Sequence, residues 1–322
     1  SWVYTQGPNR VVEALYGISH AQDLENFEKA VMDVHAPGLN VMYGDAEGNV
    51  AWWGAARLHR LPDSLSTKLF LQGAETAMTE PSPFRENPMS VNPPWGYVYS
   101  ANNQPDSTAS GVVPGYYLPE NRARRIVDIL EPSNDWDRNG VMEMITDVTS
   151  PVNPEIVENL AADLETDELT ASERPYLDAL LNWDGTANLD SKEAVIFHRW
   201  IYEWLRHTYG DELGPEGFQS LLRTHLVKRT IAPMSSRMSS IWWDDINTPD
   251  IKESKSNISM KAFRAAVTSV ERDFGGLGGS WGWKDAHTVE HAHPFGRVES
   301  LRAYFNVGPY PVNGTREVIN NL

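Results

Sequence analysis

Two adjacent side-chain amides, Asn102 and Asn103, follow a segment that reads as a β-strand over residues 96–101. Pro105 comes two residues later, so the strand is predicted to stop in a turn at this point. An amide held in one place donates N–H groups, and acyl transfer needs such donors to stabilise the negative oxygen of its tetrahedral intermediate. Asn-Asn-Gln-Pro is also typical of a plain turn, and taken alone the residues favour that interpretation.

Three arginines, Arg122, Arg124 and Arg125, open a helix predicted over residues 120–130. Arginines on a surface helix usually cover apolar neighbours with their stems while the guanidinium stays in water. One of the three could instead hold a substrate carboxylate, or steady Asn102 through a charge-assisted hydrogen bond. Both interpretations stay open at the level of the residues.

Ser1 occupies the first position of the chain. An N-terminal serine can act as a nucleophile with its own α-amino group as the base. The usual pKa of an α-amino group, about 7.7–8.0, suits that role. Any proteolytic fragment also begins with some residue, so the position does not decide between the two interpretations.

Three histidines near the end of the chain, His287, His291 and His293, could bind a metal ion. His287 and His291 would lie one turn apart on a helix, a spacing that suits zinc. Pro294 follows His293 directly and argues against a continuous helix there. The favoured interpretation is therefore that these histidines make structural hydrogen bonds.

Two further motifs have both a chemical and a structural interpretation. The glycine-rich stretch Gly275–Trp283 resembles a phosphate loop only loosely, because it lacks the Gly-Lys-Ser/Thr ending, and a flexible turn is favoured. Asp244 and Asp245 could form the acid and base pair of a glycosidase. Adjacent aspartates more often cap a helix or face solvent, which is the interpretation we favour.

The chain contains 12 tryptophans, which raises the question of stacking on sugars. Two pairs are adjacent, Trp52-Trp53 and Trp242-Trp243. Neighbouring residues of a strand face opposite sides, so one tryptophan of each pair is expected in the core.

The composition excludes several classes of function. Across 322 residues there are 27 Lys and Arg against 44 Asp and Glu, a formal net charge of −17. Nucleic acids and anionic membranes need clustered basic residues, so we expect neither as a partner. The absence of cysteine excludes disulfides, thiolate metal sites and a cysteine nucleophile. No apolar run approaches the roughly 20 residues of a membrane span.

The pattern of apolar residues predicts strands first and helices later. Residues 23–31 read as a helix, and residues 40–45 and 50–55 read as a hairpin closed by a Gly-Asn turn. Helices are predicted over 120–130, 139–147, 154–164, 174–181, 192–208 and 260–274. This α+β layout divides the chain into a β-rich part at 1–118, a helical region at 119–274 and an irregular aromatic part at 275–322.

Seven segments, in this order, resemble segments of the penicillin acylase (penicillin amidase) family and together cover nearly the whole chain. They are the helix around residues 21–30, NVMYGDAEGNVAWWG (40–54), NPPWGYVYSANNQP (92–105), NRARRIVDILEP (121–132), LLNWDGTANLDSKEAVIFHRW (180–200), WGWKDAHTVEHAHP (281–294) and FNVGPYPVNG (305–314).

The resemblance implies a fold and a reaction. The fold would be part of the αββα sandwich of an N-terminal-nucleophile (Ntn) hydrolase, with residues 1–118 in that core and residues 275–322 returning toward it. The reaction would be hydrolysis of the amide bond of a small N-acyl compound through an acyl-enzyme. Carried over by position, Asn102 matches the side-chain oxyanion donor, and Arg122 matches the arginine that supports it.

The chain departs from the family pattern at its start. The family nucleophile is a serine followed by asparagine, well upstream of the hairpin, whereas Trp2 follows Ser1 here. We therefore expect an interior piece of the large (β) chain, truncated at both ends and inactive alone. The nucleophile, the backbone half of the oxyanion hole and the small (α) chain would then lie outside it.

The resemblance also bears on cofactors, location and substrate. It implies no required cofactor, allows a structural calcium whose ligands it does not place here, and favours an extracytoplasmic (periplasmic or secreted) location. Two alternatives stay open. One is an acyl-homoserine-lactone acylase, and the other is a non-catalytic binding module that uses exposed aromatic residues.

Overall fold

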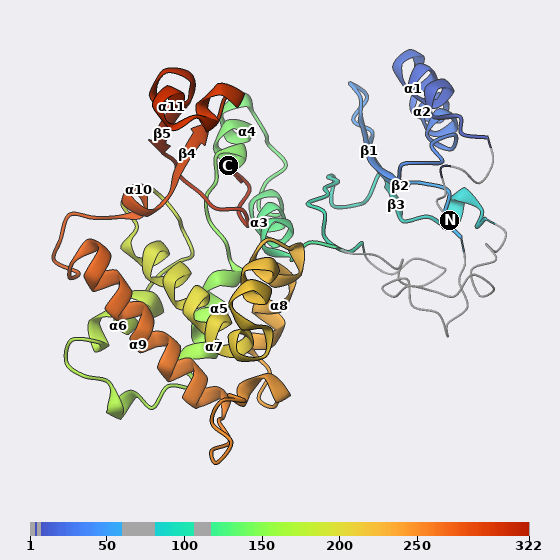
Figure 1. Cartoon of the computed structure of the whole chain (residues 1–322). Helices are drawn as coiled ribbons and strands as arrows, with labels where there is room; N and C mark the ends of the chain where they lie inside the picture. Colours follow the sequence, from blue (N-terminus) through green and yellow to red (C-terminus); the bar gives the residue numbers. More distant parts are fainter. Residues whose placement is uncertain (1–3, 5–7, 60–80, 106–116, 322) are drawn as a thin grey trace. The chain divides into compact units, whose positions relative to one another are not determined.

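The chain is seen in a computed structural model that describes residues 4, 8–59, 81–105 and 117–321. Contacts along the chain divide it into two compact units. The first unit comprises residues 1–118 with 130–134, and the second comprises residues 119–129 with 135–322. Figure 1 shows short helices and strands in the first unit and longer helices in the second.

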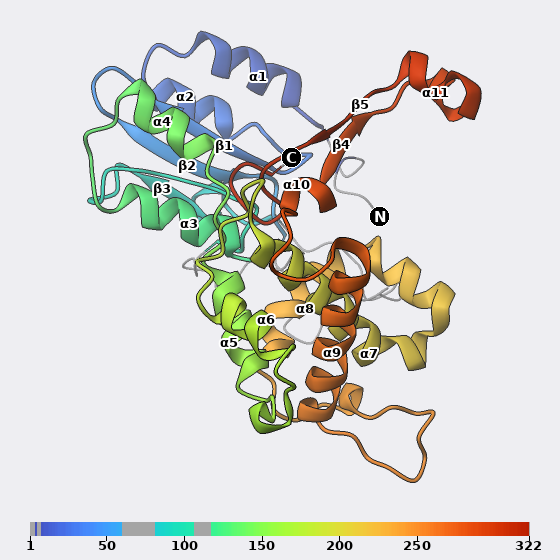
Figure 2. The same cartoon turned by 90° about the vertical axis from the view of Figure 1, so that its left-hand side faces the viewer.

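A three-stranded antiparallel sheet forms the centre of the first unit. Its strands, in spatial order, are β1 (Leu39–Gly44), β2 (Val50–Ala55) and β3 (Met89–Val91). Helices α1 (Val11–His20) and α2 (Leu24–Val31) lie against one face of the sheet (Figure 2). The predicted hairpin is therefore confirmed.

Strand β2 shows why the sheet has one covered face. Its residues alternate in burial: Ala51, Trp53 and Ala55 are fully buried, whereas the residues between them are partly exposed. A strand points successive side chains to opposite faces, so this alternation marks one face as core. The Trp53 ring packs against Phe27 of α2 at a centroid distance of 5.9 Å. Trp52 lies on the opposite, open face.

The second unit is a helical body with a small β-ribbon. Its helices are α3 (Asn121–Leu130), α4 (Arg138–Ile145), α5 (Val152–Ala161), α6 (Arg174–Leu181), α7 (Lys192–Leu222), α8 (His225–Ser235), α9 (Lys255–Phe274), α10 (Trp283–Ala286) and α11 (Glu299–Phe305). Strands β4 (Thr288–His291) and β5 (Val307–Pro311) pair antiparallel. Four single 3₁₀ turns complete the described elements, at Phe84–Glu86 in the first unit and at Thr166–Glu168, Ile241–Trp243 and Pro294–Arg297 in the second.

Helices α7 and α9 pack along each other and hold the main core. Trp200 and Trp204 of α7 are fully buried, and the Trp200 ring meets Phe263 of α9 edge to face at 5.0 Å. Helix α7 is broken at Gly214, which has a non-helical φ of 64° and precedes Pro215. Aromatic side chains bury large apolar areas, so the packing of these two helices stabilises the unit.

The expected α+β class with a large helical portion is confirmed. The predicted helices are present, although α7 continues 14 residues beyond the predicted end at residue 208, at Leu222. The strand predicted over residues 96–101 is wrong: these residues form no strand in the described part of the chain. They have a β-prone sequence, but β3 ends at Val91 and no described strand pairs with them.

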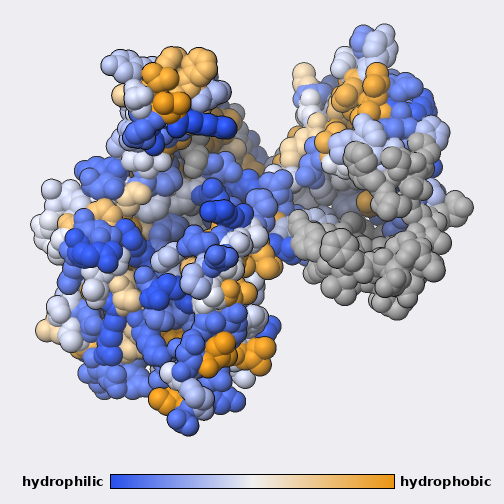
Figure 3. All heavy atoms as spheres, in the orientation of Figure 1, coloured by the Kyte–Doolittle hydropathy of each residue, from blue (hydrophilic) through white to orange (hydrophobic). Residues whose placement is uncertain are grey.

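The β4–β5 ribbon carries an exposed apolar end. Figure 2 shows α11 at the far end of the ribbon, and Figure 3 shows apolar residues gathered over it. Tyr304 is 83% exposed and Phe295 is 59% exposed. None of the described helices combines the length and apolar character that crossing a lipid bilayer demands.

A stack of three rings fixes His198 in the second unit. His198 of α7 stacks on Trp283 at 5.0 Å, and Trp283 stacks in turn on His287 at 4.8 Å. The Nε2 of His198 is buried without a hydrogen-bond partner among the described residues. Burial, reinforced by the nearby His287, lowers the pKa of His198 to about 4. His198 is therefore held neutral.

We predict that acid destabilises the second unit through His198. The folded pKa lies near 4 and the unfolded value near 6.5, so only the unfolded state takes up a proton between these values. The free energy of unfolding should fall by up to about 3 kcal/mol as the pH drops through this window. Urea titrations at a series of pH values should show that the free energy of unfolding falls less steeply with decreasing pH in His198→Phe than in the wild type. An unchanged slope in His198→Phe would contradict this account.

Candidate active site

The turn that carries Asn102 is closed by its neighbour. The Oδ1 of Asn103 accepts a hydrogen bond from the backbone N of Ala101 at 3.2 Å, and its Nδ2 donates to the carbonyl of Gln104 at 3.3 Å. The carbonyl of Asn102 accepts from the backbone N of Leu118 at 2.8 Å. The two amides therefore differ in role, because the Asn103 side chain builds the turn.

Asn102 has an unusual backbone conformation, with a φ of 62°. This left-handed region is costly for most residues and is tolerated best by glycine, asparagine and aspartate. Such a conformation is kept only where the surroundings impose it, and it is found preferentially at functional sites. Asn102 is exposed, while Ala101 before it is buried. The turn thus presents Asn102 outward from an anchored base.

Two asparagines fasten the segment before this turn to the sheet. The Nδ2 of Asn87 donates to the carbonyls of Gly54 and Ala56 at 3.0 and 2.8 Å. The Oδ1 of Asn92 accepts from the backbone N of Val50 at 3.0 Å. Asn87 and Asn92 flank the three residues of β3, so both ends of this short strand are held against β2.

The hairpin loop forms the other half of this network. Asp45 accepts hydrogen bonds from the backbone N atoms of Glu47 and Asn49, from the Asn49 Nδ2 and from the Tyr43 hydroxyl. These bonds, led by that of the Asn49 side chain, lower the pKa of Asp45 below its usual value. The Oδ1 of Asn49 then accepts from the Nδ2 of Asn92 at 2.9 Å, which joins the loop to the segment that leads to Asn102.

A cavity of about 380 Å³ lies against the open face of this sheet. Ser100 and Asn103, on either side of Asn102 in the sequence, are part of its lining, as are four aromatic residues of the first unit. The aromatic residues are Trp52, Trp95, Tyr97 and Tyr99. Pockets of this size suit small molecules.

Helix α3, which carries Arg122, is anchored in the second unit by its other polar residues. Arg125 makes two hydrogen bonds to Asp147, at 3.0 and 2.6 Å, and Arg124 makes two to Glu155. The buried Asn121 donates to the Oγ of Ser150 at 3.0 Å. Arg124 and Arg125 are thus engaged by carboxylates of the protein, and the role at the site that the family resemblance implies for Arg122 stays a prediction.

Asn102 and Arg122 belong to different compact units. The prediction that Arg122 supports Asn102 therefore stays a prediction. What the structure does show is that each residue lies on a backbone fixed by side-chain hydrogen bonds within its own unit.

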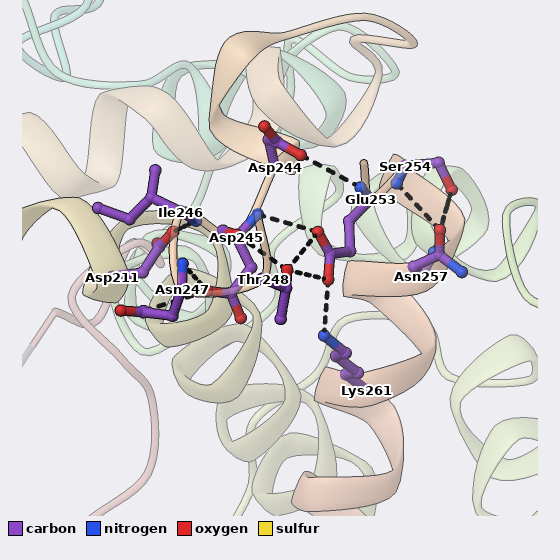
Figure 4. A network of polar contacts seen from close by, with 10 residues as sticks. All are labelled: Asp211, Asp244, Asp245, Ile246, Asn247, Thr248, Glu253, Ser254, Asn257 and Lys261. Atoms are coloured by element: carbon purple, nitrogen blue, oxygen red, sulfur yellow. Dashed lines mark hydrogen bonds and ion pairs between the residues drawn. The ribbon is translucent and has the colours of Figure 1, made fainter. Parts of the chain in front are cut away.

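The aspartate pair has a structural role (Figure 4). Asp244 Oδ1 accepts from the backbone N of Glu253 at 3.3 Å, and Asp245 Oδ1 accepts from the backbone N of Asn247 at 3.1 Å. Glu253 is nearly buried and accepts from the hydroxyl of Thr248. The two aspartates therefore order the loop before α9.

The glycine-rich loop is built for a cation rather than for phosphate. Its carbonyls at Leu277 and Gly279 accept hydrogen bonds from the Nζ of Lys192, the second at 2.6 Å. The Nε1 of Trp281 donates to the carbonyl of Gly276 at 3.0 Å. A phosphate loop presents N–H groups instead, so the expected turn is confirmed, and its carbonyls are bonded to Lys192.

The histidines near the chain end also serve the structure. His287 lies within 3.2 Å of the carbonyl of Val312 through its Nδ1, and His293 accepts from the backbone N of Phe295. No cluster of three or more His, Asp or Glu side chains that could hold a metal occurs in the described ranges.

One tryptophan of each pair is buried, as predicted, although Trp242 and Trp243 lie in a 3₁₀ turn and not in a strand. Ser1 lies outside the described residues. Trp53 and Trp243 are buried, and their partners Trp52 and Trp242 are partly exposed.

Asn87 and Asn92, which hold the segment before the Asn102 turn, were not identified from the sequence. Both precede a proline, and this repeated Asn-Pro pattern is the signal that could have revealed them.

Comparison with known proteins gives one consistent result. The family model described as penicillin amidase matches residues 1–322. An acyl-homoserine lactone acylase QuiP of Pseudomonas aeruginosa is 24% identical over 98% of this chain and 40% of the relative. The QuiP protein of a Pseudomonas fluorescens strain is 24% identical over 97% of this chain and 40% of its own length. The chain thus spans about two fifths of these relatives.

A solved structure shows the same fold. Thermostable penicillin G acylase from Alcaligenes faecalis matches with a TM-score of 0.64 at 16% identity. The match covers 85% of this chain and 56% of that one. This likeness confirms the predicted fold class, part of the Ntn-hydrolase sandwich.

We predict that Asn87→Ala loosens the sheet edge beneath the candidate site. The change removes the hydrogen bonds that Asn87 donates to the carbonyls of Gly54 in β2 and of Ala56 just after β2. Leaving these two carbonyls without this donor should lower the free energy of unfolding by about 1–3 kcal/mol. Hydrogen exchange of the backbone amides of residues 50–56 should quicken by roughly 5- to 150-fold. Asn139→Ala, at an exposed position on α4, should leave these amides unchanged. Equal exchange in both variants would show that Asn87 does not hold the strand.

Proposed function

Because the chain belongs to the penicillin amidase family, we propose that the protein containing it hydrolyses the amide bond of small N-acyl compounds. The observation that carries the proposal is Asn102. It occupies the position of the family motif, its left-handed backbone is fixed by the turn, and it is exposed to solvent. An accessible amide on a firmly held backbone suits the role of an oxyanion donor.

The proposed reaction has two steps. A serine hydroxyl, outside the described residues, attacks the acyl carbonyl while its own α-amino group takes the proton. The carbonyl oxygen becomes negative in the tetrahedral intermediate, and the Nδ2 of Asn102 donates to it. The C–N bond then breaks, the amine leaves with the proton, and an acyl ester remains on the serine. Water attacks this ester through a second such intermediate and releases the acid.

Arg122 is proposed as a positioning residue. Its neighbours on α3 are bound to Asp147, Glu155 and Ser150, so the helix backbone is held firmly within its unit. A guanidinium on such a helix can hold an amide in one orientation through charge-assisted hydrogen bonds. Fixing Asn102 before the reaction avoids the cost of ordering it in the transition state.

Two alternatives concern substrate and class. The names of the relatives at 24% identity favour an acyl-homoserine lactone as the N-acyl substrate. This refinement rests on those names, because no described residue distinguishes one acyl chain from another. A non-catalytic aromatic-rich binding module is the other alternative, and it would leave the motif position of Asn102 unexplained.

The proposal implies no cofactor, because serine, amine and amide supply the whole reaction. The partners would be a small N-acyl substrate, the small (α) chain and the N-terminal part of the large chain. The relatives, of which this chain spans about two fifths, are long enough to include such parts. An extracytoplasmic location is proposed from the family resemblance.

We predict that Asn102→Gly lowers kcat of the complete protein by about 10²–10³, with KM little changed. Glycine suits the left-handed backbone, so this variant removes the amide without adding strain. Asn102→Ala should lose the same activity and also some stability, because alanine is strained at a φ of 62°. Steady-state release of a chromophoric amine measures both variants. Normal turnover in folded Asn102→Gly would exclude the oxyanion role.

A second prediction concerns Arg122. If it acts through Asn102, Arg122→Ala should lower kcat in the wild-type background and have little further effect in Asn102→Gly. The double-mutant cycle separates positioning from a general structural role, because a structural loss would lower activity equally in both backgrounds. Arg229→Ala, on α8, serves as the matched control. Additive effects of the two changes would contradict the assignment.

A further inference from the structure

The far end of the β4–β5 ribbon is an ordered structure of its own. We call residues 293–306 the ribbon tip; they include α11 and the 3₁₀ turn before it. The rings of Phe295 and Phe305 meet edge to face at 5.3 Å, and His293 stacks on Phe305 at 5.2 Å. The Oδ1 of Asn306 accepts from the backbone N of His293 at 3.0 Å. These contacts join the start of the tip to its end.

Polar contacts also fix the tip to the strands of the ribbon. The guanidinium of Arg302 on α11 donates twice to the carboxylate of Glu290 on β4, at 3.1 and 2.7 Å. A Cβ atom on Gly296 would lie only 1.7 Å from the Oδ1 of Asn306, so the turn closes tightly around this amide. The side chains on the tip therefore stand on a backbone with a defined shape.

Apolar side chains of the ribbon tip and of β5 are nevertheless exposed to solvent (Figure 3). Leu301, Tyr304 and Phe305 have the spacing of neighbours on one helix face. Six apolar residues of this region are exposed by 37% or more: Phe295, Val298, Leu301, Tyr304, Val307 and Tyr310. Gathered apolar residues of this kind mark a surface that packs against a partner.

The composition of β5 indicates how such a partner would bind. Every residue of β5 is exposed, and Pro309 and Pro311 have no backbone N–H to offer to a further strand. Prolines on an edge strand oppose the addition of another strand. On this edge, docking therefore depends on the apolar side chains rather than on main-chain pairing.

Length and charge favour one occupant for this surface. The chain spans about two fifths of the QuiP relatives, so members of the family have much further sequence with which the surface can pack. A two-stranded ribbon gains stability from such packing. A second copy of this chain is a poorer partner, because each copy has a formal net charge of −17 and like charges oppose association.

We propose that the ribbon tip is the docking site for an apolar surface formed by sequence of the complete protein outside these 322 residues. Tyr304 and Phe295, as large rings on a fixed backbone, pack into a recess of that surface. The proposal concerns the packing of the tip and holds whatever reaction the complete protein performs. It therefore does not rest on the proposed role of Asn102.

Hydroxyl-radical labelling of the complete protein tests whether the tip is covered. Tyr304 should react at least tenfold more slowly than the tyrosine of a short reference peptide in the same sample. In the 322-residue chain this side chain is 83% exposed, so an uncovered Tyr304 would react at nearly the rate of the peptide. A rate close to that of the peptide would overturn the proposal, and the labelling needs no variant that has to fold.

Variants of the complete protein test whether the ring itself is packed. Tyr304→Ser removes the ring and should lower the thermal midpoint by at least about 2 °C, whereas Tyr304→Phe keeps it and should lower the midpoint by less than about 1 °C. An unchanged midpoint in Tyr304→Ser would contradict docking through this ring. Sedimentation of both variants identifies the occupant: a twofold loss of mass in Tyr304→Ser alone would make the tip an interface between copies and overturn the proposed one.

Discussion

The short strand β3 is tied to β2 by side-chain amides at both of its ends. Strand β3 pairs with β2 over only three residues, and a ladder of that length supplies few backbone hydrogen bonds. Asn87 and Asn92 add three bonds to β2 and the residue after it, one asparagine at each end of the strand. Asn49 and Asp45 extend this network into the hairpin loop. The Asn102 turn and part of the lining of the aromatic cavity follow from this attachment, because the chain that leaves β3 builds the turn and supplies Trp95, Tyr97 and Tyr99 to the cavity.

The second unit contributes rigidity of a different kind. Large aromatic residues of α7 and α9 form a buried core, and polar side chains of α3 fasten that helix to its surroundings. Arg122 therefore stands on a helix whose position is set by its neighbours. Within its own unit, each of the two proposed residues thus stands on a backbone that side-chain hydrogen bonds hold in place. Electrostatic stabilisation of an oxyanion depends on such groups being in place before the reaction.

Local sequence signals explain what could be predicted. The hairpin has a Gly-Asn turn between β-prone runs, and α2 begins at Asp23, which caps it. Asn102 was identified through its motif, but its left-handed backbone was not, because it depends on contacts with Leu118 and Asn103. The strand over residues 96–101 failed for a related reason: strand propensity is realised only where a partner strand exists. Asn87 acts across more than thirty residues, a distance that no local pattern reports.

Hydrolysis of N-acyl-4-nitroanilides, with phenylacetyl and a series of linear acyl groups, tests the central claim most directly. The assay compares the 322-residue chain with the protein encoded by the complete reading frame. Our account predicts release of 4-nitroaniline by the complete protein and none by the chain alone. The absence of release by the complete protein with every acyl group would contradict an amide hydrolase. Release by the chain alone would instead place the nucleophile within it, at Ser1.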